Sequence, residues 1–294
     1  MTTPPVRYKS PAAEARFKAK YESLLSTWHI QPESIWVTTE FGESHVLVAG
    51  AKDAPPIVLI PGAQATAGMW GPLASKLSLE RKLYCVDLID QVGLSRPTNV
   101  LSSPEDSDLW LGQTLDGLGL AQPDLVGNSI GAFIAAKYAS ANPDRVSSLV
   151  LTAPAATVST VSPLYILKVI ASMSLPIERL KTKFLLSTGA GAVSVGDPLF
   201  QVLQCAMSES NIVSKLVPRA LTEQELLALT MPVLLLQGRR DSVNSGAAEE
   251  ICQRMAASIP NLDCETLDDA GHLWAQEHFI KAGELIAQFL KCAR

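Results

Sequence analysis

A serine between two glycines is the sharpest chemical motif in this 294-residue sequence. Gly127-Asn128-Ser129-Ile130-Gly131 follows the strand-like run Leu125–Gly127 and leads into a helical segment over Ile130–Ser140. A strand, a sharp turn and a helix in this order expose the central hydroxyl, and the glycines avoid collisions with the turn. A chance match in a Gly- and Ser-rich loop is the alternative, but the flanking elements favour Ser129 as a nucleophile. The amide of Ile130, at the helix start, is then one expected oxyanion donor.

A serine nucleophile needs a base, and the base needs a carboxylate to orient it. When the nucleophile lies in such a turn, the acid and then the histidine follow it along the chain. Only His272 and His278 come after the serine, and His272 directly follows the strand-like run Leu262–Leu267. We therefore predict His272 as the base, and His278 as a solvated side chain at the start of a surface helix.

The orienting acid should also follow a strand. Asp241 comes after the apolar run Val233–Gln237 and a glycine turn, whereas no carboxylate follows the run Val146–Thr152. Asp268 and Asp269 lie too near the histidine in sequence to orient it easily. We predict Asp241 as the acid, and the other two as solvated loop residues or a helix cap.

A second oxyanion donor is expected in the loop Ile60-Pro61-Gly62-Ala63-Gln64, which follows another apolar run. The Ala63 amide is the best candidate, because Gly62 allows the backbone to approach a ligand closely. A plain Pro-Gly turn is the alternative reading. Sequence proximity to these motifs then predicts four pocket residues, although tryptophan is more often a core residue: Gln64, Trp70, Asn128 and Trp274.

The elements around these motifs predict an α/β fold. Short apolar runs without polar alternation are separated by helical segments, which indicates a mostly parallel sheet covered on both faces. The runs are Ile57–Ile60, Lys82–Asp87, Leu125–Gly127, Val146–Thr152, Val233–Gln237 and Leu262–Leu267. Before them, residues 11–28 read as an amphipathic helix with Ser10 as its N-cap, and residues 34–39 and 44–49 as a hairpin.

Residues 155–230 break this rhythm. They are rich in Leu, Ile, Met, Ser and Gly, with helical stretches at Leu164–Met173 and Ile177–Leu186. Ligands of open α/β sheets bind at the carboxyl ends of the strands, and mobile elements commonly cover such sites. We predict a core domain over 1–154 and 231–294, with 155–230 as a helical lid. The alternative is that this segment only extends the core.

Composition and charge exclude several classes of function. The net charge is −5, so a footprint for nucleic acid is absent and anionic membrane surfaces should repel the chain on average. No apolar run approaches the roughly 18 residues needed to span a bilayer, and Met1–Ser10 has no apolar core typical of a secretory signal. The default expectation is a soluble cytoplasmic protein without a membrane partner, and a homodimer stays open.

The cysteines and histidines predict neither a disulfide framework nor a metal site. Five cysteines are scattered without a CxxC pair, so we expect free thiols of a reducing compartment. Four histidines show no ligand spacing. The glycines of residues 112–119 form no GxGxxG. We therefore expect no metal, nucleotide or other cofactor.

Taken together, these motifs resemble the α/β-hydrolase superfamily of carboxylesterases. More narrowly, the chain is similar to bacterial carboxylesterases that hydrolyse aryl-propionate esters, the naproxen-esterase type. The likeness spans most of the chain and is carried by Ser26–Trp28, Thr39–Val46, Asp53–Ala63, Val86–Asp90, the serine turn and Ala270–His272. It implies that Ser129, Asp241 and His272 form a triad, that the Ala63 and Ile130 amides bind the oxyanion, and that a small, largely apolar ester is the substrate.

Two departures from the family pattern leave the substrate open. The family usually has His-Gly where this chain has Pro61-Gly62, and Asn128 is polar where an apolar or His residue is common. The polar pair Gln64 and Asn128 would suit a more functionalised substrate, so a thioesterase, C–C hydrolase, lyase or cyclase is the alternative. A non-catalytic ligand receptor is a third hypothesis, because function must be inferred from the site rather than from the fold.

Overall fold

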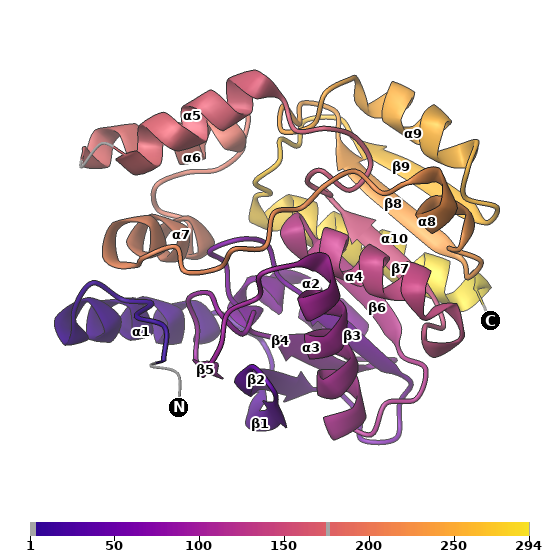
Figure 1. The fold of residues 1–294 in the computed structure, drawn as a ribbon, viewed down its shortest axis with the longest axis horizontal. Coiled ribbons are helices and arrows are strands. Elements are labelled where there is room, and N and C mark those ends of the chain that lie inside the picture. Colours follow the sequence, from indigo (N-terminus) through magenta and orange to yellow (C-terminus); the bar gives the residue numbers. More distant parts are fainter. Residues whose placement is uncertain (1–3, 175–176, 294) are drawn as a thin grey trace.

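A twisted, mostly parallel sheet runs through the molecule and is covered by helices on both faces (Figure 1). The computed structural model describes residues 4–174 and 177–293. Residues 1–3 and 294 of the predicted core domain and residues 175–176 of the predicted lid therefore lie outside the described residues. The architecture confirms the predicted α/β-hydrolase fold.

The sheet has the strand order β1-β2-β4-β3-β6-β7-β8-β9, with β5 paired to β2. β1 and β2 form the predicted antiparallel hairpin, β2 pairs antiparallel with β4, and the pairs from β4 to β9 are parallel. The strands are β1 (Glu33–Thr39), β2 (Gly42–Ala49), β3 (Pro56–Ile60), β4 (Lys82–Val86), β5 (Arg96–Pro97), β6 (Asp124–Asn128), β7 (Leu149–Thr152), β8 (Val233–Gly238) and β9 (Leu262–Leu267).

The helices are α1 (Pro11–Leu25), α2 (Gly71–Leu77), α3 (Pro104–Gly117), α4 (Ile130–Ala141), α5 (Pro163–Ser174), α6 (Glu178–Thr188), α7 (Pro198–Glu209), α8 (Glu223–Leu227), α9 (Ala248–Ala256) and α10 (Gln276–Cys292). Short 3₁₀ turns lie at Ala67–Trp70 and Pro143–Arg145. Ser10 caps α1 as predicted, because its hydroxyl accepts a hydrogen bond from the Ala13 amide. Across the two described ranges, no helix is both long and apolar enough to cross a membrane.

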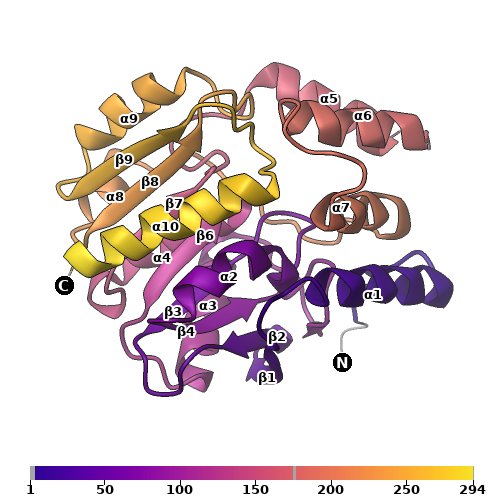
Figure 2. The ribbon, with the colours of Figure 1, turned by 180° about the vertical axis from the view of Figure 1, so that it is seen from behind.

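Apolar side chains of each inner strand alternate between two cores. In β3, Val58 and Ile60 face the core that contains α3, α4 and α9, whereas Ile57 and Leu59 face the core that contains α2 and α10. Figure 2, seen from behind, shows α10 and α2 across the second face. Because both faces are covered, the strands need no polar alternation.

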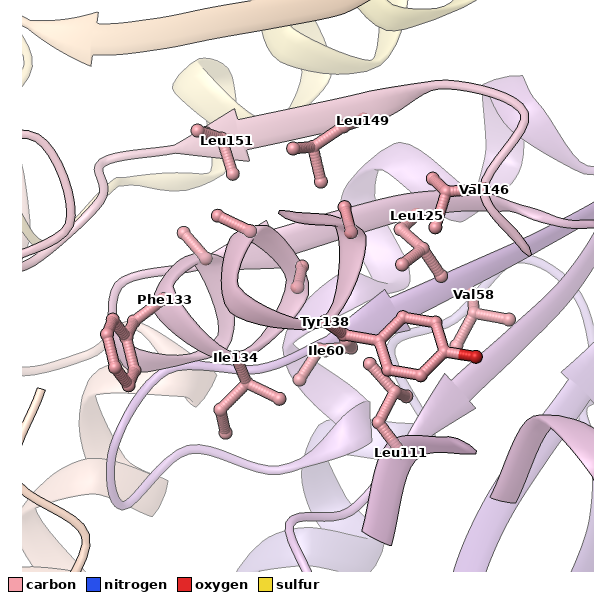
Figure 3. Packing of buried hydrophobic residues seen from close by; sticks show 14 of the residues in the cluster. Val58, Ile60, Leu111, Leu125, Phe133, Ile134, Tyr138, Val146, Leu149 and Leu151 are labelled. Atoms are coloured by element: carbon pink, nitrogen blue, oxygen red, sulfur yellow. The ribbon is translucent and has the colours of Figure 1, made fainter. Parts of the chain in front are cut away.

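Helix α4 is the most deeply buried helix of the first core. Ten consecutive residues, Ile130–Ala139, are buried. Figure 3 shows Phe133, Ile134 and Tyr138 of this helix gathered with Leu125 of β6 and Leu149 of β7. Fully burying one large apolar side chain stabilises a fold by about 1.5–3 kcal/mol, so α4 is anchored firmly behind the turn that precedes it.

The segment predicted as a lid lies between β7 and β8 and contains α5, α6, α7 and α8. The helices predicted within it are confirmed as α5 and α6. Helix α7 packs along α1, where Val202 and Ala206 join Phe17 and Tyr21 in a third, smaller core. Both views show α5 and α6 beyond α7, at the outer edge of the molecule (Figures 1 and 2).

One expectation about the cysteines is wrong. Cys252 of α9 and Cys264 of β9 form a disulfide, whereas Cys85, Cys205 and Cys292 are free thiols. The two partners are twelve positions apart in the sequence. The sequence pattern concealed this pair because neither spacing nor count indicates which helix packs on which strand; β8 and β9 pair, and α9 lies against them.

The disulfide should stabilise the fold by closing a loop in the unfolded chain. For a loop of this length, closure contributes about 3 kcal/mol. The double variant Cys252→Ala, Cys264→Ala should therefore lose about that much free energy of unfolding in a urea titration of the oxidised protein. Reductant should lower the stability of the wild type and leave the double variant unchanged. Equal sensitivity of both proteins to reductant would contradict the pairing.

Candidate active site

Ser129 stands in a strained turn between β6 and α4. Its backbone has φ 54° and ψ −116°, a conformation that residues other than glycine avoid. The cost of such a conformation is about 1–3 kcal/mol and is borne only where the surroundings enforce it. Here the buried strand before the serine and the buried helix after it leave the chain no other path. The local structure is the one predicted from the sequence.

Both flanking glycines are required by close backbone contacts. A Cβ on Gly127 would lie 2.3 Å from the carbonyl oxygen of Gly131. A Cβ on Gly131 would lie 2.3 Å from the Ile60 oxygen and 2.5 Å from the Pro61 oxygen. The absence of a side chain at Gly131 therefore has a second effect. It allows the start of helix α4 to approach the loop after β3 closely.

The three side chains predicted as a triad form one hydrogen-bonded chain. The Oγ of Ser129 lies 2.9 Å from Nε2 of His272, and Nδ1 of His272 lies 2.8 Å from Oδ2 of Asp241. Asp241 follows β8 and His272 follows β9, as expected from their sequence positions. The Asp241 side chain is fully buried, and its Oδ1 accepts a bond from the Val243 amide. Burial and this bond hold the carboxylate toward the imidazole.

The insertion helps to hold the histidine in place. The backbone amide of His272 donates to the carbonyl oxygen of Thr188, at the end of α6, over 2.9 Å. The ring of Tyr165 on α5 lies 6.4 Å from the imidazole, centroid to centroid. Burial is the main cause that raises the pKa of Tyr165, with the Asp241 charge acting in the same direction, so its phenol stays protonated.

The rival residues take other positions. Asp268 and Asp269 are solvated, with 84% and 68% of their side chains exposed, as predicted. His278 is not solvated: its side chain is 5% exposed, its Nδ1 accepts a bond from the Ala275 amide, and its Nε2 lies 3.2 Å from Asp269. The prediction for His278 was wrong because this side chain folds back over the start of α10 and satisfies its first backbone donor.

A second Ser–His–Asp arrangement lies in the sheet, and sequence reasoning missed it. His45 Nδ1 lies 2.8 Å from Asp87 Oδ2, and His45 Nε2 lies 3.1 Å from Ser34 Oγ. Asp87 also accepts bonds from the Tyr21 hydroxyl and the Ala67 amide. The side chains of His45 and Asp87 are fully buried, and none of these three residues lines the cavity beside Ser129. This group therefore ties β1, β2, β4 and α1 together.

The Ser129 hydroxyl, in contrast, opens into an apolar cavity of about 360 Å³. The serine turn and the loop after β3 form one wall, and helices α5, α6 and α7 form the other. The lining from the helices includes Tyr165, Val169, Phe184, Leu185, Leu203 and Met207. Within the described residues, His272 is the only lining residue with a basic side chain, and no lining residue is acidic. The sequence carried no signal for the helix residues, since their rotation toward the serine depends on packing.

The two amides predicted as oxyanion donors flank the serine. A Cβ on Gly62 would lie 3.3 Å from the Ser129 Cβ, so the loop that carries Ala63 runs directly against the turn. Ala63 and Ile130 both line the cavity. Within the described residues, neither of their amides is engaged by a protein acceptor. Two backbone donors therefore remain open beside one hydroxyl.

The polar pair Gln64 and Asn128 lines the cavity, as predicted, but both side chains are already engaged. Asn128 donates to the Thr152 hydroxyl over 3.1 Å. The Gln64 side-chain oxygen accepts a bond from the Ser210 hydroxyl, and the backbone amide of Gln64 donates to the Gln91 side chain over 2.7 Å. Their main structural effect is to hold the two loops that meet at Ser129.

Comparison with known proteins identifies the family of the chain. The model of the alpha/beta hydrolase family matches residues 57–282, more than half of the chain. The chain therefore belongs to the alpha/beta hydrolase family. This confirms the family predicted from the motifs.

Two relatives within this family are Bacillus subtilis esterases. Carboxylesterase YbfK is 28% identical, covering 94% of this chain and 93% of its own. The crystal structure of the same esterase, CesB (YbfK), superposes with a TM-score of 0.86 over 95% of this chain and 98% of that chain. The crystal structure of naproxen esterase (carboxylesterase NP) has a TM-score of 0.86 at 24% identity, covers 96% of this chain and 99% of that chain, and shares the fold.

Another relative is named for a different substrate. The 2-hydroxy-6-oxononadienedioate/2-hydroxy-6-oxononatrienedioate hydrolase 2 of Pseudomonas putida is 30% identical over 82% of this chain and 89% of its own. The family of the chain is therefore clear, whereas its substrate has to be argued from the cavity.

The predicted tryptophans of this hydrolase do not line the Ser129 cavity. Trp70 is fully buried, and Trp274 is 2% exposed; both rings pack edge-on against Phe279 of α10. Trp274 lines a second cavity of about 400 Å³, which shares Met69, Leu199 and Leu273 with the first. Proximity in sequence was misleading because the chain turns each ring into the core below the site.

The strained backbone of Ser129 predicts that glycine is more stabilising than alanine at this position, the reverse of their order within a helix. Both Ser129→Ala and Ser129→Gly remove the hydroxyl, but only glycine tolerates the φ of 54° without cost. Ser129→Gly should therefore be more stable than Ser129→Ala by about 1 kcal/mol or more in urea unfolding. At Ser140, within α4, the order should reverse, with glycine less stable than alanine by about 1 kcal/mol. The same order at both positions would show that the turn is unstrained.

Proposed function

We propose that this hydrolase cleaves the carboxylic ester of a small, largely apolar substrate, with Ser129 as the nucleophile, His272 as the base and Asp241 as the orienting acid. The observation that carries the proposal is the unbroken hydrogen-bonded chain from Asp241 to Ser129, which ends in an apolar cavity. The similarity to carboxylesterases over more than nine-tenths of the chain supports the same reaction.

The first half of the reaction acylates the enzyme. Ser129 Oγ attacks the acyl carbon while its proton passes to His272 Nε2, and the Asp241 carboxylate stabilises the imidazolium. The oxyanion that forms accepts bonds from the Ala63 and Ile130 amides, an interaction typically worth about 10²- to 10³-fold in rate for each donor. The ester C–O bond then breaks, and the alcohol leaves with the proton from His272.

The second half releases the acid. A water molecule attacks the acyl carbon while His272 takes one of its protons, and the same amides bind the second oxyanion. When the bond to Ser129 breaks, its Oγ regains the proton from His272 and the carboxylic acid departs. Asp241 takes no proton in either half of the reaction; its carboxylate fixes the tautomer and orientation of the imidazole.

The insertion over residues 155–230 serves as the lid in this proposal. Residues of this segment, from helices α5, α6 and α7 and from its loops, supply most of the apolar lining, so they exclude water and select the acyl or alcohol group by shape. The core over 1–154 and 231–294 supplies the three reacting side chains and both amides. The two parts thus separate substrate choice from chemistry.

The assignment of the nucleophile can be tested against the second Ser–His–Asp group. Ser129→Ala should lower kcat/KM for p-nitrophenyl butyrate by at least about 10³-fold without loss of fold. The matched variant Ser34→Ala removes the hydroxyl beside His45 and should retain activity near that of the wild type. A fluorophosphonate probe should label the wild type and Ser34→Ala, but not Ser129→Ala. Esterase activity that survives Ser129→Ala would refute the proposal.

The second candidate function is carbon–carbon bond hydrolysis, which the sequence analysis leaves open, and the similarity to a hydrolase named for a dioate gives a substrate class to test. A dioate carries two carboxylates, and a buried carboxylate needs a cationic or hydrogen-bonding partner. In the described residues, the Ser129 cavity contains no Lys or Arg that could pair with one. The lining therefore favours a neutral ester over an anionic substrate.

Two matched esters distinguish these candidates. The p-nitrophenyl ester of pentanoic acid is neutral, whereas the mono-p-nitrophenyl ester of glutaric acid has similar length and a terminal carboxylate. Desolvating that carboxylate in an apolar cavity should cost the second ester at least about 10²-fold in kcat/KM. Equal or preferred turnover of the anionic ester would instead favour the dioate-type candidate.

A further inference from the structure

Helix α5 is apolar on two opposite faces. Tyr165 and Val169 line the Ser129 cavity on its inner side. Its outer side exposes large apolar residues, with Leu164 at 61%, Leu167 at 62% and Ile170 at 55%. A helix that is apolar all round is normally buried in a core or in lipid. Because isolated surface leucines are common but contiguous ones are not, this outer face requires a partner.

The surroundings of this face are basic in a chain that is acidic. From residue 163 to residue 188 the sequence has four cationic side chains, Lys168, Arg179, Lys181 and Lys183, and one anionic side chain, Glu178. The segment thus carries +3, and since the whole chain carries −5, the remainder carries −8. The net charge of the whole chain predicts repulsion from an anionic membrane on average. The positively charged segment 163–188 should be attracted to such a membrane instead.

The charge of this segment also favours a lipid surface over a second copy of the chain as the partner of α5. A two-fold symmetric dimer places the same patch on both sides of the interface, so two segments of +3 would face each other. An anionic phospholipid surface instead attracts the lysines. Each lysine near the surface contributes about a fivefold gain in membrane affinity. The lipid surface also takes up the leucines, as it does for helices that lie in the membrane interface.

We propose that the outer face of α5, defined by Leu164, Leu167 and Ile170, docks on an anionic phospholipid surface with Lys168 and Lys183 at the headgroups. Both views place α5 and α6 at the outer edge of the molecule (Figures 1 and 2). Because Tyr165 of the same helix lies 6.4 Å from His272, docking brings apolar esters dissolved in lipid beside the cavity. This second consequence rests on the proposed function, whereas docking itself does not.

Vesicle binding tests the docking. The wild-type protein should co-sediment with vesicles of phosphatidylcholine containing 30% phosphatidylglycerol, and bind pure phosphatidylcholine at least about tenfold more weakly. The triple variant Leu164→Ser, Leu167→Ser, Ile170→Ser should lose at least about tenfold in affinity for the anionic vesicles. A double variant Lys168→Glu, Lys183→Glu should lose a similar amount and show weaker dependence on salt.

A matched control removes exposed apolar residues elsewhere. Val6 and Leu79 are 67% and 73% exposed and lie outside α5 and α6. The double variant Val6→Ser, Leu79→Ser should bind anionic vesicles as the wild type does. Binding that falls equally in the control would show that general surface hydrophobicity, rather than the α5 face, is responsible, and would overturn the proposal.

Activity on two kinds of substrate separates docking from chemistry. The triple variant should hydrolyse water-soluble p-nitrophenyl butyrate like the wild type, but lose its activity on a long-chain ester embedded in anionic vesicles. Ser129→Ala should be inactive on both and still bind the vesicles. Failure of the wild type to bind anionic vesicles at low salt, or a change from dimer to monomer in the triple variant by light scattering, would refute the lipid surface as the partner.

Discussion

The close approach of α4 to the loop after β3 is the contact on which the site depends. At Gly131 the helix comes so near the Ile60 and Pro61 carbonyls that a single added methyl group would collide with both. This contact holds the loop that carries Ala63 against the turn at Ser129, and both Ala63 and Ile130 line the cavity beside the serine. The strain at the serine is sustained because the buried helix behind it cannot relax.

The parallel sheet explains how the other two side chains reach the serine. β6, β7, β8 and β9 pair in parallel, so their carboxyl ends lie along one edge. Asp241 and His272 leave the last two strands at that edge, 112 and 143 residues after the serine in sequence. A modest loop after each strand is then sufficient to form the hydrogen-bonded chain.

Two Ser–His–Asp groups in one chain show that the set of residues does not by itself make a reactive site. The group at Ser34 has similar hydrogen-bond distances, but its histidine and aspartate are enclosed by the sheet and α1. The group at Ser129 differs in having open amides and a cavity beside the hydroxyl. The insertion and the core line that cavity together, and helix α5 of the insertion carries the exposed apolar face on its other side.

The sequence alone determined the elements that local patterns encode. Apolar runs without alternation predicted the buried parallel strands, and the glycine-flanked serine between a strand and a helix predicted the strained turn. Chain order then predicted Asp241 and His272, because each follows a strand whose position in a parallel sheet is constrained.

Tertiary structure decided what depends on contacts between distant segments. Trp70 and Trp274 went to the core rather than the pocket, His278 became a buried helix cap, and Cys252 met Cys264 across α9 and β9. The cavity lining from α5 to α7 was equally hidden. The rotation of a helix about its axis is set by side-chain packing against its neighbours, and local sequence patterns do not predict that packing.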